Sequence, residues 1–309
     1  MKIIIRMNKN LIISLILLLA FYSNNLLAFE NKILLKIDNE IVTTIDIAKE
    51  IEYLKTINKE INTLEKNKII EIAKNSIVRD KIKKISLEKI FEEFKVDEEY
   101  LNQLIVNKYR RIGFQDLDSF KKYLNQNNVK YEKIREKMII DAMWSEFIYA
   151  KYKDNIKIDR NKIAEEMTQK KNKNYLLSEI IFNGIDKKEL ETNYNNILKT
   201  IKENGFENAA LIHSTSQSAE NGGKLGWIKE ASLSKIILNE ISKLKKGDYT
   251  SPIKIPGGFI ILKINDYKEE SISENVEEEI NKIIKIKTNE QLNQYSNIYF
   301  NKIKKDIVI

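Results

Sequence analysis

The chain contains no cysteine, two prolines, nine glycines and one histidine among its 309 residues. Without cysteine there can be no disulfide bond, no thiolate metal site, no thiol nucleophile and no lipid anchor attached through a cysteine. The sequence also offers no motif for a metal or a cofactor, and we expect neither. Stability must therefore come from a hydrophobic core, for which the 42% of apolar residues is sufficient.

Glycine and proline are distributed very unevenly along the chain. Between residues 29 and 174 there is one glycine and no proline, whereas residues 175–270 hold the other eight glycines and both prolines. Neither residue type occurs after Ser271. Because these residues mark turns and interrupt helices, the pattern predicts a helical region, a turn-rich region and a helical tail. We place these regions at 29–172, 173–270 and 271–309.

The first 28 residues have the three parts of a secretory signal peptide. A basic start is followed by an apolar run from Leu11 to Phe21 and by a small residue, Ala28. The run of 11 residues is shorter than the roughly 20 that span a bilayer. We therefore predict a signal peptide at 1–28, cleavage near Ala28, export to the periplasm and no stable membrane insertion of the mature chain.

The formal net charge of +8 is compatible with a protein that binds nucleic acid or a membrane surface. Three of these charges, Lys2, Arg6 and Lys9, belong to the predicted signal peptide, which has no acidic residue, so the mature chain carries +5. The remaining lysines are interleaved with glutamates rather than gathered into one basic block. We interpret this pattern as a solvated surface and predict no binding to nucleic acid.

The region 29–172 is predicted to be a short hairpin followed by helices. Two β-prone runs, Ile33–Ile37 and Ile41–Thr43, flank a turn-forming Asp-Asn pair. Thr43, with Asp46 three residues later, predicts the start of the first helix. The methionines and aromatic residues of the last helix are interpreted as core, and the region as scaffold. The apolar periodicity predicts further helices over about 64–94, with a break near Ser86 as an alternative, and over about 97–112, 117–125 and 129–153.

The turn-rich region is predicted to be a small antiparallel sheet with helices packed against it. We expect a strand at Tyr175–Phe182, a helix at Lys187–Asn204 that ends at Gly205, a glycine-rich loop, a helix at Leu233–Leu244 and a strand at Phe259–Leu262.

The tail continues at helical spacing and ends in the strand-like Ile307–Ile309. Because a lone helix cannot bury its apolar face, we expect this tail to pack on the N-terminal helices, with its last residues beside the hairpin. The predicted fold class is α+β, with a mostly helical body built from both ends of the chain and a small second domain.

Three glycines occur within residues 218–227, SAENGGKLGW, in a chain that is otherwise poor in glycine. With KGDYTSP at 246–252 and GGFIIL at 257–262, this segment resembles the parvulin-type (PpiC, rotamase) peptidyl-prolyl isomerase domain over about 175–266. The flanking parts are similar to the SurA family of periplasmic chaperones, with a signal peptide, a hairpin-led helical N-terminal domain and a C-terminal helix and strand that return to it. One parvulin module is present where many members carry two.

The resemblance implies a proline-sized apolar cleft in the parvulin domain. Its apolar wall falls on Leu225, Leu233 and Ile237, and Phe259 is a further candidate for substrate binding. The glycines of the loop are expected to allow positive φ angles or close packing, so their role is to form the fold and not to catalyse.

The polar residues of parvulin pockets are not retained in this chain. The two family histidines fall on Glu179 and Ile260, and the Cys or Asp position falls on or beside Thr215. His213 lies at a different place, before the glycine loop, and we interpret it as a hydrogen-bonded structural residue rather than a catalytic one. We therefore name no catalytic residue and expect weak or absent isomerase activity.

Two functions from different classes follow from the resemblance. The favoured one is a periplasmic chaperone that binds unfolded outer-membrane proteins or other extended polypeptides between the helical body and the parvulin domain, without a cofactor. The alternative is an active parvulin isomerase that tolerates the histidine losses, because rotation about the X-Pro bond needs no covalent step. A basic nucleic-acid or membrane-surface protein is a third interpretation, which the predicted export and the dispersed charge disfavour.

Overall fold

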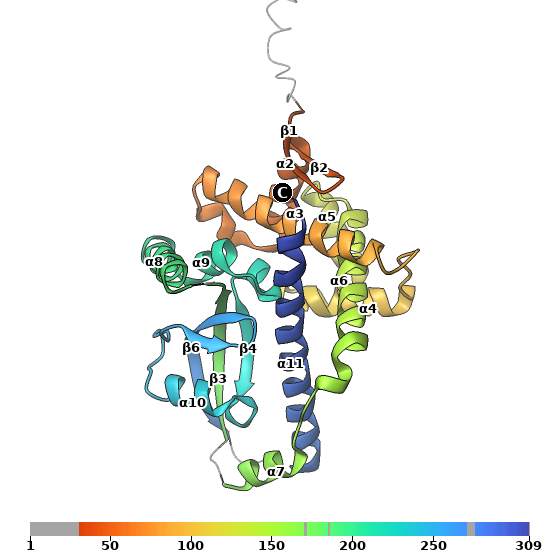
Figure 1. The fold of residues 1–309 in the computed structure, drawn as a ribbon. Coiled ribbons are helices and arrows are strands. Elements are labelled where there is room, and N and C mark those ends of the chain that lie inside the picture. The colour runs from red at the N-terminus through yellow and green to blue at the C-terminus, as the bar shows by residue number, and fades with distance from the viewer. Residues whose placement is uncertain (1–30, 170–171, 185, 271–275, 309) are drawn as a thin grey trace, which may run out of the picture.

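The computed structural model describes residues 31–169, 172–184, 186–270 and 276–308, so the predicted signal peptide lies outside the described residues. The fold is α+β, with many helices, a two-stranded sheet and a four-stranded sheet. Figure 1 shows the four-stranded sheet on one side, the N-terminal helices on the other and the long helix α11 (Val276–Asp306) between them. In the part of the chain that the structure describes, every helix is too short or too polar to cross a bilayer.

The described chain begins with a hairpin and a capped helix. Strands β1 (Ile33–Ile37) and β2 (Glu40–Thr43) are antiparallel, and helix α2 (Thr44–Ile57) follows. The backbone N–H of Asp46 donates to Thr43 Oγ1 at 3.3 Å, and the backbone N–H of Thr43 donates to the Asp46 carboxylate at 2.9 Å. This reciprocal cap satisfies two N–H groups at the helix start, which confirms the predicted boundary between strand and helix.

The rest of the N-terminal part is a helical body. Asp97 and Asp116 cap the second and third of its further helices by accepting the backbone N–H groups of Tyr100 and Ser119. The helices lie close to the predicted positions, except that the first one ends at Glu88 and not near residue 94. These helices are α3 (Lys66–Glu88), α4 (Glu98–Tyr109), α5 (Leu117–Gln126) and α6 (Tyr131–Tyr152).

The four-stranded sheet is antiparallel, in the order β4-β3-β6-β5. The two predicted strands, β3 and β6, pair at its centre, with Ile181 opposite Ile260. The short edge strands β4 and β5 were not predicted, because a few residues interrupted by glycine or flanked by proline show no clear alternation of their own. The bounds are β3 (Asn172–Phe182), β4 (Lys224–Lys229), β5 (Ile253–Ile255) and β6 (Gly258–Glu270).

Helices cover both faces of this sheet. On one face, α8 (Lys187–Asn204) and α9 (Phe206–His213) pack against Ile180 and Ile261, and α10 (Lys235–Ile241) packs on the other. Helix α8 coincides with the predicted helix, α9 was not predicted, and α10 is shorter than predicted. Helix α7 (Arg160–Gln169) connects the helical body to the sheet (Figure 1).

The glycine loop lies tightly against strand β3. A Cβ atom on Gly223 would lie 2.1 Å from the carbonyl oxygen of Glu179, and its φ angle is +74°. The backbone N–H of Glu179 also donates to the carbonyl of Gly223 at 2.8 Å. A side chain at Gly223 would push the loop off the sheet, so this glycine is required by close packing and by backbone conformation together.

Helix α11 packs on the helical body through aromatic residues. Trp144 of α6 donates from Nε1 to Ser296 Oγ at 2.7 Å, and the ring of Tyr152 stacks on Tyr295 with 4.6 Å between centroids. The expected strand at 307–309 does not form in residues 307–308, because the helix continues to Asp306 and leaves too few residues. Instead, the backbone N–H of Asp38 in the hairpin donates to the carbonyl of Val308 at 2.9 Å.

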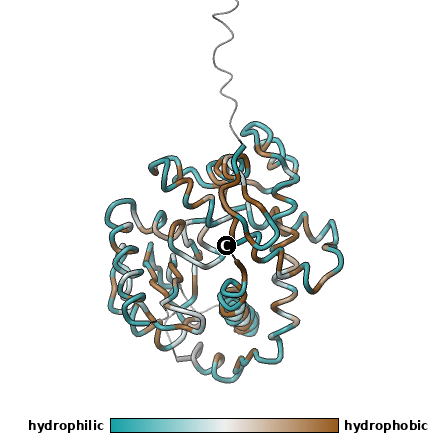
Figure 2. Tube along the Cα trace, turned by 45° about the horizontal axis from the view of Figure 1, so that its top comes forward, coloured by the Kyte–Doolittle hydropathy of each residue, from teal (hydrophilic) through white to brown (hydrophobic). Residues whose placement is uncertain are grey.

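The helical body and the sheet region share a hydrophobic core. Leu211 and Ile212 of α9 belong to the same buried cluster as Ile72 and Ile77 of α3. Figure 2 shows hydrophobic residues recurring along the helices and strands of both parts, while the outer turns are mostly hydrophilic. The division of the chain near residue 172 therefore stays a proposal about sequence segments, because the two segments do not have fully separate cores.

Candidate functional site

A hydrogen-bonded polar cluster lies on β3 and in the segment before the glycine loop. Ser218 Oγ donates to Glu179 Oε1 at 2.8 Å, Ser218 and Ser216 hydroxyls are 2.7 Å apart, and Ser216 and Ser214 hydroxyls are 2.9 Å apart. The chain of hydroxyls ends at the backbone, where the N–H of Ile181 donates to Ser214 Oγ at 3.0 Å. These contacts hold the Glu179 side chain in one position on the sheet.

The environment of Glu179 favours its neutral form. Burial raises the pKa of Glu179, and the hydrogen bonds from Ser218 and Ser216 only partly oppose that rise. A protonated carboxyl group can donate a hydrogen bond as well as accept one. Glu179, onto which the parvulin resemblance is expected to place one family histidine, is thus a carboxyl group with a raised pKa.

The structure brings together two of the four predicted apolar site residues. Leu233 and Ile237 lie in one cluster with Ile260, on the face of the sheet that α10 covers. Phe259 lies in the cluster on the opposite face, where its ring is 5.9 Å from that of Phe182. Leu225 is 38% exposed and belongs to neither cluster. The apolar surface beside Glu179 therefore consists of Leu233, Ile237 and Ile260 among the predicted residues.

Thr215 does not take part in the polar cluster through its side chain. Its hydroxyl and its backbone N–H both donate to the carbonyl of Ile181, at 3.2 and 2.7 Å. The neighbouring Ser216 and Ser218 are the residues that reach toward Glu179. Their alternation with Ser214 is a signal in the sequence that could have indicated this, because residues two apart in an extended segment face the same side.

His213 is the last residue of α9, which packs with α8 on one face of the sheet. Its Nε2 atom lies 2.8 Å from the hydroxyl of Thr200 on α8. Burial, together with the charge of Lys68, lowers the pKa of His213 to about 4, so the ring is neutral at ordinary pH. The imidazole is outside the polar cluster, as expected for a hydrogen-bonded structural residue.

One side of α11 lies along the sheet region. Lys287 Nζ donates to the carbonyl of Ser232 at 2.9 Å, and Asn301 Nδ2 donates to the carbonyl of Gly257 at 3.3 Å. Glu290 lies on the same side of the helix, three residues after Lys287. Burial raises the pKa of Glu290 to about 7. The charge of Lys287 lowers this pKa, and the charge of Glu179 raises it further. Two carboxyl groups with raised pKa values therefore lie near each other, one on the sheet and one on the tail.

Glu290 is expected to make the stability of the protein depend on pH. Because its pKa rises from 4.5 in the unfolded chain to about 7, its contribution is fully present below pH 4.5 and is lost as the pH rises through 7. Between pH 5 and pH 8, Glu290 should therefore lower the free energy of unfolding of the protein by roughly 2–3 kcal/mol, and Glu290→Gln should abolish this part of the fall. Urea unfolding of both proteins at the two pH values measures this. Parallel pH curves for the two proteins would contradict it.

A buried charge network joins the glycine loop to the helical body. Glu220 of the loop lies 3.8 Å from Lys108 Nζ and 3.5 Å from Ser76 Oγ. Ser76 Oγ also donates to Glu50 at 2.7 Å, and Lys137 is bonded to both Glu50 and Asp80. Burial opposes ionisation of Glu220, but Lys108 and Lys137 outweigh it and lower its pKa. The loop is thus held on the body by charges that have little contact with solvent.

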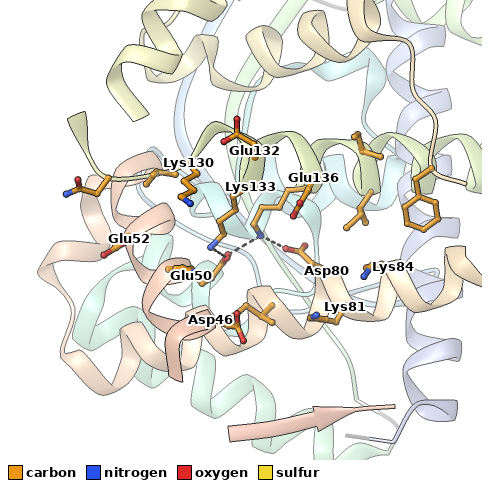
Figure 3. Close-up of a pocket in the computed structure, with 18 residues that line it drawn as sticks. Asp46, Glu50, Glu52, Asp80, Lys81, Lys84, Lys130, Glu132, Lys133 and Glu136 are labelled. Carbon is orange, nitrogen blue, oxygen red and sulfur yellow. Dashed lines mark hydrogen bonds and ion pairs between the residues drawn. The ribbon is translucent and has the colours of Figure 1, made fainter. Parts of the chain in front are cut away.

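A cavity of about 790 Å³ lies in the helical body at the other end of this network. It is formed by α2, α3, the segment at Phe94, and α6 with the turn before it. Figure 3 shows Lys133 reaching toward Glu50, and Lys137 pairs with both Glu50 and Asp80. This cavity was not predicted, because its lining residues come from four separated segments, at residues 46–52, 77–84, 94 and 128–140.

Comparison with known proteins places the sheet region in a family. Residues 178–266 match the rotamase family, described as the PPIC-type PPIASE domain. Chaperone SurA of Pseudomonas putida is 26% identical over 194 residues, which are 59% of this chain and 45% of that protein. Chaperone SurA of Escherichia coli O157:H7 is 42% identical over 73 residues, which are 24% of this chain and 17% of that protein. The chain thus spans less than half the length of these curated relatives.

A solved structure, described as one of two SurA-like chaperones of Campylobacter jejuni, covers 90% of this chain and 98% of its own, with 16% identity and a TM-score of 0.35. The match at 178–266 defines the class: the protein contains a PPIC-type, or parvulin, rotamase domain. The similarity to chaperone SurA of Pseudomonas putida, which extends over 194 residues, reaches beyond this domain.

Proposed function

We propose that this protein is a periplasmic chaperone that holds unfolded polypeptides, among them outer-membrane proteins, and has weak or no isomerase activity. The observation that carries the proposal is the composition of the parvulin cleft. Glu179 and Ile260 stand where the family has histidines, Glu179 is bonded to serine hydroxyls, and the one imidazole lies at the back of the sheet. An apolar surface without its imidazoles can still bind extended chains.

The predicted signal peptide supports the proposed periplasmic location. The N-terminal 28 residues have the pattern of a cleaved signal peptide, and SurA is the relative that the helical body and the parvulin domain match together. The proposed clients are polypeptides with exposed apolar side chains, which an apolar surface that includes the partly buried Ile237 can contact without recognising a particular sequence.

An active isomerase is a second candidate, and the polar cluster favours it. Glu179 with its raised pKa can donate a hydrogen bond beside the apolar residues, so the cleft keeps one polar group near a bound proline. Such a donor could favour the twisted amide over the planar one, which is the requirement for lowering the rotational barrier of about 20 kcal/mol.

The two functions are separated by a paired assay on the mature chain, residues 29–309. We expect the protein to delay aggregation of a urea-unfolded β-barrel protein while accelerating cis–trans isomerisation of a short proline peptide little over background. Ile237→Glu places a charge in the cleft, and Ile236→Glu is the matched control because Ile236 is 64% exposed. Robust isomerisation that is lost in Ile237→Glu and kept in Ile236→Glu would establish the second candidate instead.

A further inference from the structure

Helix α11 is joined to the sheet region near its start. Glu279 pairs with Lys229, the last residue of β4. Eight residues further on, Lys287 Nζ donates to the carbonyl of Ser232 at 2.9 Å. Ser232 directly precedes Leu233, which belongs to the apolar surface beside Glu179. The helix therefore reaches the sheet region next to the parvulin cleft.

A second group of contacts lies near the end of α11, at the turn between β5 and β6. Asn301 Nδ2 donates to the carbonyl of Gly257 at 3.3 Å and to Asn183 Oδ1 at 3.2 Å, and Asn183 Nδ2 donates to Asn301 Oδ1 at 2.9 Å. A Cβ atom on Gly257 would lie 3.1 Å from Ile298 Cγ1, so the turn and the helix lie close together. Helix α11 thus runs along the sheet region from the end of β4 to this turn (Figure 1).

Glu290 lies midway between these contacts and on the same side of the helix. It follows Glu279 by 11 residues and precedes Asn301 by 11 residues. About 11 residues complete three turns of an α-helix, so the three side chains share one stripe. The charge of Glu179, on β3, acts on Glu290. At the centre of the contact, therefore, two carboxyl groups lie near each other.

The other side of α11 is packed on the helical body. Leu292, Tyr295 and Tyr299 contact its hydrophobic cluster, and Trp144 donates to Ser296. Buried apolar and aromatic contacts of this kind stabilise packing more than hydrogen bonds and ion pairs near the surface do. The contact with the sheet region is thus the weaker one, so the sheet region can move away while α11 stays on the body.

We propose that α11 is a clasp over the parvulin cleft, which is closed while Glu290 and Glu179 are neutral and opens when both carry charge. The clasp would control access to the cleft named in the proposed function. Its test needs neither a bound client nor isomerisation of a proline bond, so failure of the clasp and failure of the proposed function are distinguishable.

The groups around Glu290 set the direction of the pH effect. Burial and the charge of Glu179 raise the pKa of Glu290 to about 7, although the charge of Lys287 opposes them. Opening exposes Glu290 and returns its pKa toward 4.5, so the closed form binds this proton more tightly. The closed form is therefore favoured at low pH, and this advantage is lost as the pH rises through 7.

Charged side chains on the other elements around α11 act at different positions. Arg160 of α7 pairs with Glu277, Lys229 of β4 with Glu279, and Lys83 of α3 with Asp141 of α6, while the charge of Glu230, beside Ser232, acts on Tyr175. Lys287 and Glu179 are therefore the charges through which Glu290 responds to pH.

Paired spin labels measure the opening directly. The chain has no cysteine, so Lys254→Cys on β5 and Lys285→Cys on α11, both exposed, label only these two sites of the mature chain. We expect the population at the longer distance to rise about tenfold between pH 5.5 and pH 8. Glu290→Gln should abolish this rise, whereas Glu278→Gln, at an exposed carboxyl group of the same helix, should keep it. The same distances at both pH values, or an equal rise in Glu290→Gln, would overturn the proposal.

Charge reversal tests whether the clasp covers the cleft. Glu290→Lys puts a cation near Glu179 and should keep the clasp closed at pH 8. A single thiol in the cleft, Ile237→Cys, should then react with a maleimide several times more slowly than in the chain that keeps Glu290. The control thiol, Ile236→Cys, should react at one rate in both, because Ile236 is 64% exposed. Equal rates at position 237 in the two chains would overturn the proposal.

Discussion

Lys137→Met is expected to lower the free energy of unfolding by about 3–5 kcal/mol, because it leaves buried carboxylates without their partner. Lys137 is 9% exposed and is bonded to Glu50, Asp80 and Ser76. Burial alone would lower its pKa, but the charges of Asp80, Glu50 and Glu220 raise it well above the usual range. The lysine therefore stays charged in the interior. Asp80 depends on it most, because Glu50 also pairs with Lys133 and Glu220 lies near Lys108.

Urea unfolding followed by circular dichroism measures the loss. Lys95→Met is the control, because Lys95 forms an ion pair with Glu93 on the surface, where its side chain is 84% exposed and a change below about 1 kcal/mol is expected. Adding Asp80→Asn to Lys137→Met should restore part of the stability, since it removes one stranded charge. A loss below about 1 kcal/mol in Lys137→Met would show that the network is not coupled to folding.

Trp144→Ala is expected to cost about 3–5 kcal/mol, because it removes the contact on which α11 packs. The indole is fully buried and lies 5.7 Å from the ring of Tyr299 and 6.4 Å from that of Phe300, measured between centroids. Its Nε1 atom also donates to Ser296, whose hydroxyl would be left without this donor in the cavity.

Two further variants serve as comparisons for Trp144→Ala. Trp144→Phe keeps an aromatic ring but loses the hydrogen bond to Ser296, so a smaller loss is expected. Trp227→Ala is the control on the sheet region, where the indole is 45% exposed. Limited proteolysis should show faster cleavage within residues 276–306 in Trp144→Ala than in the other two variants. Unchanged stability of Trp144→Ala would mean that the tail does not depend on this contact.

Local signals in the sequence predicted many element boundaries. The Thr43 and Asp46 cap, and the stop of α8 at Gly205, were recognised because they depend on hydrogen bonds and backbone angles within a few residues. Helix α9 was missed, because its eight residues, interpreted as part of a loop, are too few for a clear helical period. The short edge strands β4 and β5 were not predicted for the same reason.

The candidate site was predictable only in part. The parvulin resemblance named Leu233, Ile237 and Ile260 as site positions, and the structure places these three in one cluster. Phe259, the further candidate for substrate binding, lies in the cluster on the opposite face, because adjacent strand residues point to opposite faces.

The sequence by itself determined the α+β class, the glycine loop and the parvulin resemblance, because each depends on residues that are near in the chain. The tertiary structure decided the features that join distant segments. Glu220 comes near Lys108 and Ser76, and the charge of Glu179 acts on the pKa of Glu290, only after the loop and the tail have packed. A buried charge is tolerated only where opposite charges surround it, and which charges do so is set by the packing of helices far apart in sequence.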